Sequence, residues 1–135
     1  MNKEKACGAV IFSKDKVLLT RNPDDSFFGI PKGRSESGES EEQTALREIK
    51  EEVGIEVTIL PGFRELFHQQ IKRPYGLTDT EFVVFCADTT TTELKVDPLE
   101  TAEYRWITET ELTTLTVHPE IPALIKKAYA FRRNI

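Results

Sequence analysis

The sequence predicts an α/β or α+β fold, and three observations carry that prediction. Short apolar runs typical of strands recur along the chain, one well-capped amphipathic segment predicts a helix, and strands and helices do not strictly alternate. The chain has 135 residues, of which 39% are hydrophobic and 30% are charged. This size and composition predict a single globular domain over residues 1–135 with a core of its own.

The first third of the chain is predicted to be β-structure. Residues 6–12 form an apolar run, residues 13–15 a turn and residues 16–20 a second strand. Residues 22–38 are rich in Gly, Pro, Ser and Asp, which predicts a loop. Further strands are predicted at residues 56–60, 62–69, 81–87 and 103–107.

The central helix carries signals at both ends. Ser40 and Gln43 match a capping box, and Gly54 suits the position that follows the last helical residue. Its expected apolar stripe comprises Ala45, Leu46, Ile49 and Val53. Two later helices are expected, a short one over residues 108–115 and a final one that begins at position 119 or 122 and ends near position 132.

Charge and cysteine content restrict the class of protein. The formal net charge of −5 argues against a general nucleic-acid binder, which needs an excess of Lys and Arg. Cys7 and Cys86 lie in apolar runs and are expected to be buried, reduced thiols of a cytoplasmic protein. No apolar run is long enough to span a bilayer and no secretory signal is visible. A monomer and a homodimer both remain open.

Three carboxylates lie close together on the central helix. Glu48, Glu51 and Glu52 are spaced i, i+3 and i+4, so they share one helical face and repel one another by a few tenths of a kcal/mol per pair, roughly. One interpretation is a solvated acidic face. The other is a site for a hard cation, Mg²⁺ or Mn²⁺, which also binds substrate phosphates. The nearby Arg47 and the Gly- and Pro-containing loop 29–33 favour the cation site.

This region resembles the complete Nudix box. Gly33 is followed after five residues by Glu39, and after seven more by the run REIKEEVGI from Arg47 to Ile55. All seven fixed residues are present, and their joint occurrence by chance is on the order of 10⁻⁸ at ordinary residue usage. Weaker similarity to the family extends to residues 6–12 and to Glu100 and the stretch 104–106.

The resemblance implies a mixed β-sheet sandwiched between helices. It also implies that Glu48, Glu51 and Glu52 bind metal, that Arg47 orients a glutamate, and that Glu39 pairs with Arg47 in a structural role. Gly33 and Gly54 supply turns that a side chain would obstruct. The implied chemistry is Mg²⁺- or Mn²⁺-dependent attack of water on phosphorus, which cleaves a phosphoanhydride bond in a nucleoside diphosphate derivative. The general base differs between members and is either a box glutamate or one from a distant loop.

Several candidates lie outside the box. Glu100 precedes Trp106 by six residues, where several Nudix enzymes place a metal-binding or basic carboxylate, and Glu103 is its rival. For either residue the alternative is a surface glutamate. His68 and His118 lack a metal-ligand spacing and are expected to be structural.

Candidate substrate contacts cluster around the start of the box. Lys32 and Arg34 flank Gly33, and the Pro-Lys-Gly run is similar to diadenosine tetraphosphate hydrolases, so a cation here is expected to contact phosphate. Arg21 ends a strand directed at the same region. Tyr75, in an expected loop over residues 71–76, is a candidate for stacking on a base. Loop residues without any role are the alternative.

The favoured substrate is a small molecule, either a dinucleoside polyphosphate or a nucleoside triphosphate. The protein is expected to bind neither a membrane nor a stable nucleic-acid partner. The alternatives are an RNA 5′ pyrophosphohydrolase, an ADP-ribose or nucleotide-sugar pyrophosphatase, and a non-catalytic Nudix module that senses a ligand. The acidic balance speaks against RNA. The intact set of three glutamates speaks against the sensor, since a sensor does not need mutually repelling carboxylates.

Overall fold

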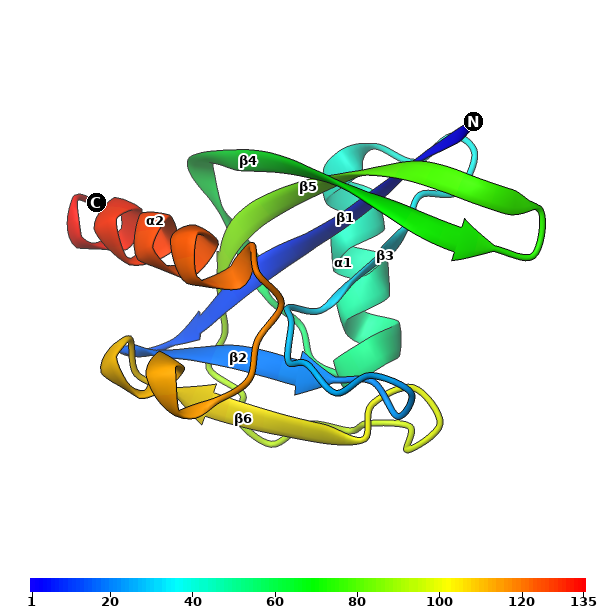
Figure 1. Cartoon of the computed structure of the whole chain (residues 1–135). Coiled ribbons are helices and arrows are strands. Elements are labelled where there is room, and N and C mark those ends of the chain that lie inside the picture. Colours follow the sequence, from blue (N-terminus) through cyan, green and yellow to red (C-terminus); the bar gives the residue numbers. More distant parts are fainter.

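The computed structural model describes all 135 residues (Figure 1). The elements follow in the order β1 (Asn2–Ser13), β2 (Lys16–Arg21), β3 (Lys32–Arg34), α1 (Glu41–Val53), β4 (Thr58–Arg73), β5 (Gly76–Asp88), β6 (Glu103–Ile107), the 3-10 helix η1 (Thr110–Thr114) and α2 (Ile121–Arg133). None of these helices is both long and apolar enough to cross a membrane.

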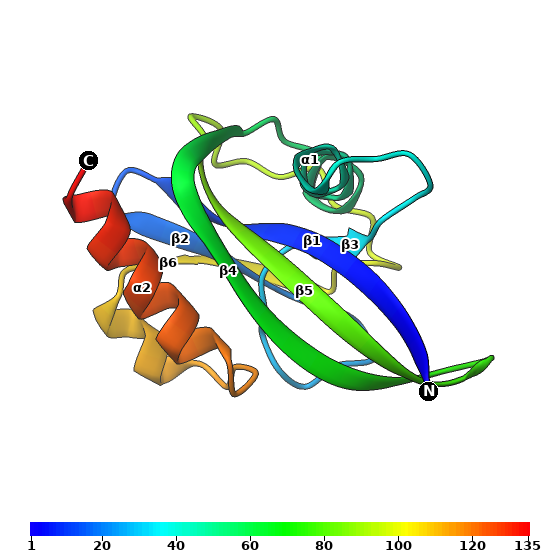
Figure 2. The ribbon, with the colours of Figure 1, turned by 90° about the horizontal axis from the view of Figure 1, so that it is seen from above.

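The strands form one mixed sheet with the order β4-β5-β1-β2-β6, and β3 pairs with β1 beside this path. The β1–β5 pair is parallel and the other neighbours are antiparallel. Figure 2 shows α1 against one face of the sheet and α2 against the other. The expected mixed sheet between helices is therefore confirmed.

Strand β1 has two different partners along one edge. Its first half pairs with β3, where Gly8 faces Lys32, and its end pairs with β2. The approach at Gly8 is close, because a Cβ added there would lie 2.2 Å from the carbonyl oxygen of Pro31. The absence of a side chain at Gly8 thus lets residues 31–33 pack closely against β1 and pair with it beside α1.

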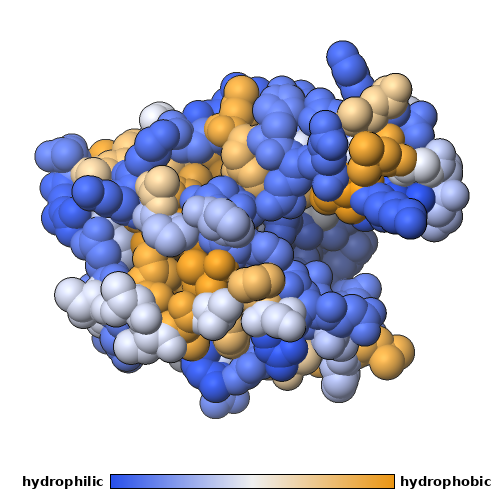
Figure 3. Space-filling model, in the orientation of Figure 1, coloured by the Kyte–Doolittle hydropathy of each residue, from blue (hydrophilic) through white to orange (hydrophobic).

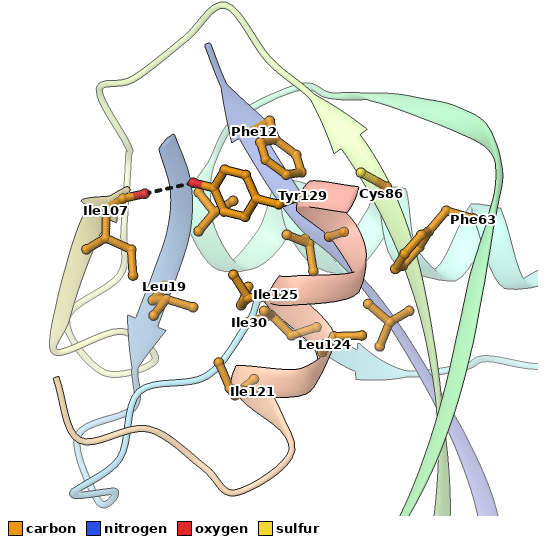
Figure 4. Close-up of a cluster of buried hydrophobic side chains, with 14 of the residues drawn as sticks. Phe12, Leu19, Ile30, Phe63, Cys86, Ile107, Ile121, Leu124, Ile125 and Tyr129 are labelled. Carbon is orange, nitrogen blue, oxygen red and sulfur yellow. Dashed lines mark hydrogen bonds between the residues drawn. The ribbon is translucent and has the colours of Figure 1, made fainter. Parts of the chain in front are cut away.

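Each face of the sheet has its own apolar core. On the α2 face, Phe12 and Leu19 pack with Ile125 and Tyr129, and Figure 4 shows this cluster. The Tyr129 hydroxyl lies 3.4 Å from the carbonyl oxygen of Ile107, the contact drawn in Figure 4, and 2.6 Å from that of Asp15. On the α1 face, the core comprises Cys7, Ala9, Ile11, Leu18, Ala45, Ile49, Val53, Ile55, Val83, Phe85 and Ala87. Burying each large side chain contributes about 1.5–3 kcal/mol.

The predicted central helix is confirmed. The Ser40 side chain accepts a hydrogen bond from the backbone N–H of Gln43, the Gln43 side chain accepts one from the Ser40 backbone, and Gly54 adopts a left-handed conformation with φ of 71°. One expected stripe residue was wrong, because Leu46 is 40% exposed while Thr44 is fully buried. The two cysteines are free and buried, as expected.

Two predictions about the loops were wrong. The expected loop over residues 22–38 contains β3, a three-residue strand. The expected loop over residues 71–76 is mostly strand, since β4 runs to Arg73 and β5 begins at Gly76. The chain therefore forms a long β4–β5 hairpin, and β1 runs beside β5 almost to the hairpin turn, where Asn2 pairs with Thr78 (Figure 1).

Other elements also differ from the predicted ones in their boundaries. The two strands expected at residues 56–60 and 62–69 are one strand, β4, because Gly62 adopts a φ of 102° and sits within a bulge instead of ending the strand. Strands β1 and β5 are longer than expected, and β6 matches the prediction. The short helix is a 3-10 turn, Thr110–Thr114, and the last helix runs from Ile121 to Arg133 with Pro122 in its first turn.

Candidate active site

Arg47 on α1 holds together the acidic groups of the box. Its guanidinium donates to Glu39 at 2.7 Å, to Glu48 at 2.8 Å and to Glu51 at 3.2 Å. It also donates to the carbonyl oxygen of Arg34 at 2.9 Å, which fixes β3 against the helix. The hydrogen bonds from Arg47, and those from the Glu36 backbone and the Thr44 hydroxyl, lower the pKa of Glu39 to about 2. The expected pairing of Glu39 with Arg47 is thus present in the structure.

Gly33 lies directly against the Glu48 carboxyl group. A Cβ at Gly33 would lie 2.0 Å from both Cδ and Oε2 of Glu48, so only glycine leaves this carboxylate where it is. Burial raises the pKa of Glu48 even though Arg47 donates a hydrogen bond to it. A second carboxylate follows one turn later, where Glu52 accepts a hydrogen bond from the Lys32 backbone N–H at 3.3 Å.

Burial also raises the pKa of Glu52, to about 7, and the negative charges of Glu48 and Glu100 act in the same direction. The positive charge of Lys32 opposes this shift. Burial and mutual repulsion disfavour the ionised form of these carboxylates, and a bound cation would stabilise that form.

Two clefts open beside this helix face, and Figure 3 shows a recess between the β4–β5 hairpin and the loops opposite it. The first, named here the box cleft, has a volume of about 500 Å³ and is lined by Asn22, Pro23, Asp24, Asp25, Lys32, Glu48, Glu52, Leu99 and Glu100. The second, the hairpin cleft, has a volume of about 770 Å³ and is lined by Glu4, Lys5, Ala6, Asn22, Lys32, Gly33, Arg34, Ser35, Glu36, Glu48, Ile71, Arg73, Tyr75 and Phe82. Asn22, Lys32 and Glu48 line both, so the two clefts meet beside the box.

The donor atoms of the box cleft suit a hard divalent cation. Its acidic side chains offer carboxylate oxygens, with no Cys or His among the lining residues. No three acidic, His or Cys side chains stand close enough together to form a complete ligand group. Glu51 stands apart, because its side chain is 56% exposed and is held by Arg47. The residues fit a Mg²⁺-like ion that completes its shell with oxygen atoms from phosphate and water.

Lys32 lies at the junction of the two clefts. Its ammonium group makes no hydrogen bond or ion pair within the chain and stands 5.3 Å from the ring centroid of Phe82. Burial lowers the pKa of Lys32, while the charges of Glu52, Glu120 and Asp25 act to raise it. A half-buried cation without a hydrogen-bonding partner is suited to an anionic ligand.

The structure separates the two acidic candidates outside the box. Glu100 lines the box cleft together with Glu48 and Glu52. Glu103 is engaged elsewhere, in ion pairs with Arg21 and Arg105. Arg21 also donates to the backbone carbonyl of Asp25 and is not among the residues that line either cleft. Of these candidates the geometry therefore places only Glu100 beside the box glutamates.

The candidate contacts Arg34 and Tyr75 lie at the hairpin cleft, where Arg34 donates to the Tyr75 hydroxyl at 3.0 Å. Sequence reasoning offered Arg73 as a phosphate contact and gave no role to Glu4. The structure joins the two, because β1 and the hairpin pair in space and Arg73 donates to Glu4 at 3.0 Å. Sequence reasoning also missed Asp25, whose carboxylate lies 2.6 Å from Nε2 of His118. No local signal marks these residues, since each belongs to the site only through the tertiary fold.

Comparisons with known proteins agree with this geometry. The family model described as NUDIX domain matches residues 2–128. The asymmetrical bis(5′-nucleosyl)-tetraphosphatase of Sus scrofa is 31% identical over 143 aligned residues, covering 94% of each chain. A C. elegans Ap4A hydrolase binary complex has a TM-score of 0.78 at 23% identity, covering 98% of this chain and 99% of the other. A NUDIX-family hydrolase from Clostridium perfringens has a TM-score of 0.80 at 21% identity, covering 97% and 99%. The chain belongs to the Nudix family and is a Nudix hydrolase that cleaves phosphoanhydride bonds.

Proposed function

We propose that this Nudix hydrolase cleaves the polyphosphate chain of a dinucleoside tetraphosphate or of a nucleoside triphosphate, with Mg²⁺ or Mn²⁺ as its cation. The observation that carries the proposal is the position of Lys32. Its unpartnered ammonium group lies where the two clefts meet, Glu48 lines both clefts as well, and the Lys32 backbone N–H donates to the Glu52 carboxylate. An extended phosphate chain that passes from one cleft to the other meets this cation.

The charge of the box cleft explains why a divalent cation is needed. Asp24, Asp25, Glu48, Glu52 and Glu100 line it, against the single cation Lys32. The negative charge of this surface repels a polyphosphate, and bound divalent cations replace this repulsion with attraction. We propose that Glu48 and Glu52 hold the cation, with Glu51 and Glu100 contributing from the two sides.

The cation, when bound, polarises the phosphoryl oxygens and lowers the pKa of the attacking water. The chain's own groups complete the reaction. Gly33 leaves the Glu48 carboxylate in its place against β3. Lys32 stabilises the negative charge that develops on the polyphosphate. A carboxylate of the box cleft, either Glu52 or Glu100, accepts the proton of the attacking water. Water enters at one phosphorus, which leaves a mononucleotide and the remainder of the substrate.

The preference for a long polyphosphate follows from its charge. A tetraphosphate or triphosphate chain carries more negative charge than the diphosphate of ADP-ribose, so it gains more from the Lys32 ammonium. The relative from Sus scrofa, which matches along 94% of both chains, is named as an asymmetrical tetraphosphatase, which supports the same substrate class.

The test compares the wild type with Lys32→Ala and Lys32→Met. Lys32→Met retains most of the apolar stem beside Phe82, so it separates loss of charge from loss of packing. Measured kcat/KM values for diadenosine tetraphosphate, ATP and ADP-ribose should show the polyphosphates to be better substrates. Both variants should lose about 1.5–3 kcal/mol of transition-state stabilisation on the polyphosphates, the contribution of a hydrogen bond to a charged group, and less on ADP-ribose. A preference for ADP-ribose, or an equal loss on every substrate, would refute the proposal.

A further inference from the structure

Lys32 is surrounded by carboxylates, and yet its ammonium group pairs with none of them. Burial lowers the pKa of Lys32, and the negative charges of Glu52, Glu120 and Asp25 act in the opposite direction, so all three carboxylates are within electrostatic reach. The ammonium group nevertheless stands over the Phe82 ring. A lysine that is withdrawn from water is normally paired, so each of these carboxylates must be held by another partner.

Asp25 is held by His118. Nε2 of His118 lies 2.6 Å from Oδ2 of Asp25, and the other carboxylate oxygen accepts a hydrogen bond from the Phe27 backbone N–H at 2.9 Å. Both oxygens of this carboxylate are therefore occupied. The side chains of His118 and Asp25 are only 28% and 29% exposed, so water would not fully replace a partner that is lost here.

This pair stands beside the Lys32 ammonium group. A Cβ built on Gly29 would lie 3.5 Å from Cδ2 of His118 and 3.8 Å from Nζ of Lys32. Cδ2 is bonded to Nε2, the nitrogen that contacts Asp25, so the three side chains meet around Gly29. A small cavity of about 40 Å³ has Asp25, Lys32 and His118 among its lining residues. A carboxylate released by His118 therefore faces an unpaired ammonium group across this cavity.

The backbone around the pair is fixed by contacts that do not involve the imidazole ring. The Phe28 backbone N–H donates to the Thr116 carbonyl at 2.9 Å, and the His118 backbone N–H donates to the Phe28 carbonyl at 3.0 Å. Arg21 also donates to the backbone carbonyl of Asp25 at 3.0 Å. Removal of the imidazole should therefore leave both segments attached and free only the Asp25 side chain.

The other two carboxylates are held in a similar manner. Gln69 on β4 donates to Glu120 at 2.8 Å, immediately before α2, and Glu52 accepts a hydrogen bond from the Lys32 backbone N–H at 3.3 Å. These donors belong to different parts of the chain. Each of them directs a carboxylate to a partner other than the Lys32 ammonium group.

We propose that His118 is a positioning residue that keeps the Asp25 carboxylate away from Lys32, so that the Lys32 ammonium group stays free for the phosphates of the substrate. Gln69 has the same role toward Glu120. The proposal rests on the proposed function, because it requires that Lys32 contacts the polyphosphate. An ion pair between Asp25 and Lys32 would neutralise the one cation that lines the box cleft, and a phosphate would then have to displace Asp25 before it could bind.

The test measures how the effect of His118→Ala depends on the two charges that it is proposed to keep apart. In the wild-type background, His118→Ala should lower kcat/KM for diadenosine tetraphosphate about ten-fold, the lower limit expected for loss of the ammonium group itself. In the Asp25→Asn and Lys32→Met backgrounds the same substitution should cost less than about two-fold, because one charge of the competing pair is absent. Asn at position 25 retains the oxygen that accepts from the Phe27 backbone. A purely structural role of His118 predicts an equal loss in all three backgrounds.

Two further variants serve as controls. His118→Gln retains an N–H donor of the kind that Gln69 offers to Glu120, so its kcat/KM should stay within about three-fold of the wild-type value. His68→Ala removes the other histidine of the chain, which lies beside Asp79 and lines neither cleft, and should leave kcat/KM unchanged.

A crystal structure of metal-free His118→Ala provides a readout that does not depend on turnover. The Asp25 carboxylate should lie within about 4 Å of Nζ of Lys32, the distance of an ion pair. An Asp25 side chain that stays away from Lys32, or an equal loss of activity in all three backgrounds, overturns the proposal. If Asp25 pairs with Lys32 in the crystal but His118→Ala hydrolyses diadenosine tetraphosphate like the wild type, the positioning of Asp25 by His118 is supported, and the proposed contact of Lys32 with phosphate is overturned instead.

Discussion

Gly33→Ala provides a direct test of the position of the Glu48 carboxylate. The new Cβ would lie 2.0 Å from Cδ and Oε2 of Glu48, far inside contact distance, so this carboxyl group must move. The displacement also disturbs the 2.8 Å hydrogen bond from Arg47 to Glu48. Because the obstructed group ends a flexible side chain, the backbone of β3 and α1 can remain in place.

Gly33→Ala is expected to change activity much more than it changes the free energy of unfolding. Moving Glu48 into a poor rotamer costs about 0.5–1.5 kcal/mol. Replacing glycine by alanine restricts the unfolded chain and contributes about 0.4–1 kcal/mol in the opposite direction, because the φ of Gly33 is not positive. The free energy of unfolding should therefore change by less than about 1 kcal/mol. The affinity for the divalent cation, and with it kcat/KM, should fall by about 10–100-fold.

Gly8→Ala is the matched control. There the added Cβ would lie 2.2 Å from the carbonyl oxygen of Pro31, which is backbone and cannot swing aside. The cost of this overpacking is about 1–3 kcal/mol, and the melting temperature should fall by several degrees, roughly. Gly33→Ala is thus expected to lose activity and keep its stability, whereas Gly8→Ala, at a nearby position, is expected to lose stability.

The assay combines thermal unfolding of the metal-free proteins with kcat/KM measured over a series of Mg²⁺ concentrations. Gly33→Ala should need more Mg²⁺ for half-maximal activity while it melts near the wild-type temperature. If it instead showed wild-type activity and metal dependence, the Glu48 carboxylate would not be required where the structure places it. A large loss of stability would show that the backbone had moved, contrary to the reasoning.

The remaining predictions concern two other glutamates. Glu52→Gln removes a half-buried negative charge whose environment includes the like charge of Glu48, so activity should fall by at least about 10²-fold while thermal stability holds or rises; full wild-type activity in excess EDTA would contradict the metal role. Glu41 on α1 accepts hydrogen bonds from Arg64 and Lys5, which lower its pKa to about 2. The stabilisation is fully present above the unfolded pKa of about 4.3 and is lost as pH falls toward 2. Unfolding by urea at pH 5 and pH 2.5 should show a smaller acid-induced loss in Glu41→Gln than in the wild type; equal losses would contradict the pairing.

What the sequence predicts well depends on local interactions. Helix α1 was located from Ser40, Gln43 and Gly54 because a capping box and a left-handed glycine act within a few residues of the helix ends. The strand expected at residues 81–87 is also present, and its own geometry places successive side chains on opposite faces, with Val84 in the core on the α2 face and Val83 and Phe85 in the core on the α1 face.

The errors arose where distant segments meet. Strand β3 has three residues and no apolar pattern, and it exists because Gly8 lets it pair with β1. The length of the hairpin was hidden because Pro74 and Gly76 indicate a loop, although only the tip turns. Glu4 could not be assigned to a cleft from spacing, because its ion pair with Arg73 joins residues 69 positions apart.

The parallel pairing of β1 with β5 also has a consequence for the order in which the chain can fold. β1 lies in the middle of the sheet, but its whole inner edge pairs with residues of the second half, such as Ala6 with Phe82 and Phe12 with Asp88. During synthesis, therefore, this edge stays unpaired until β5 has left the ribosome, although the residues of β1, β2 and α1 are synthesised earlier. The box helix is thus synthesised before the sheet that supports it, and a nascent chain that ends before Gly76 contains no part of β5 and cannot form the central strand pair.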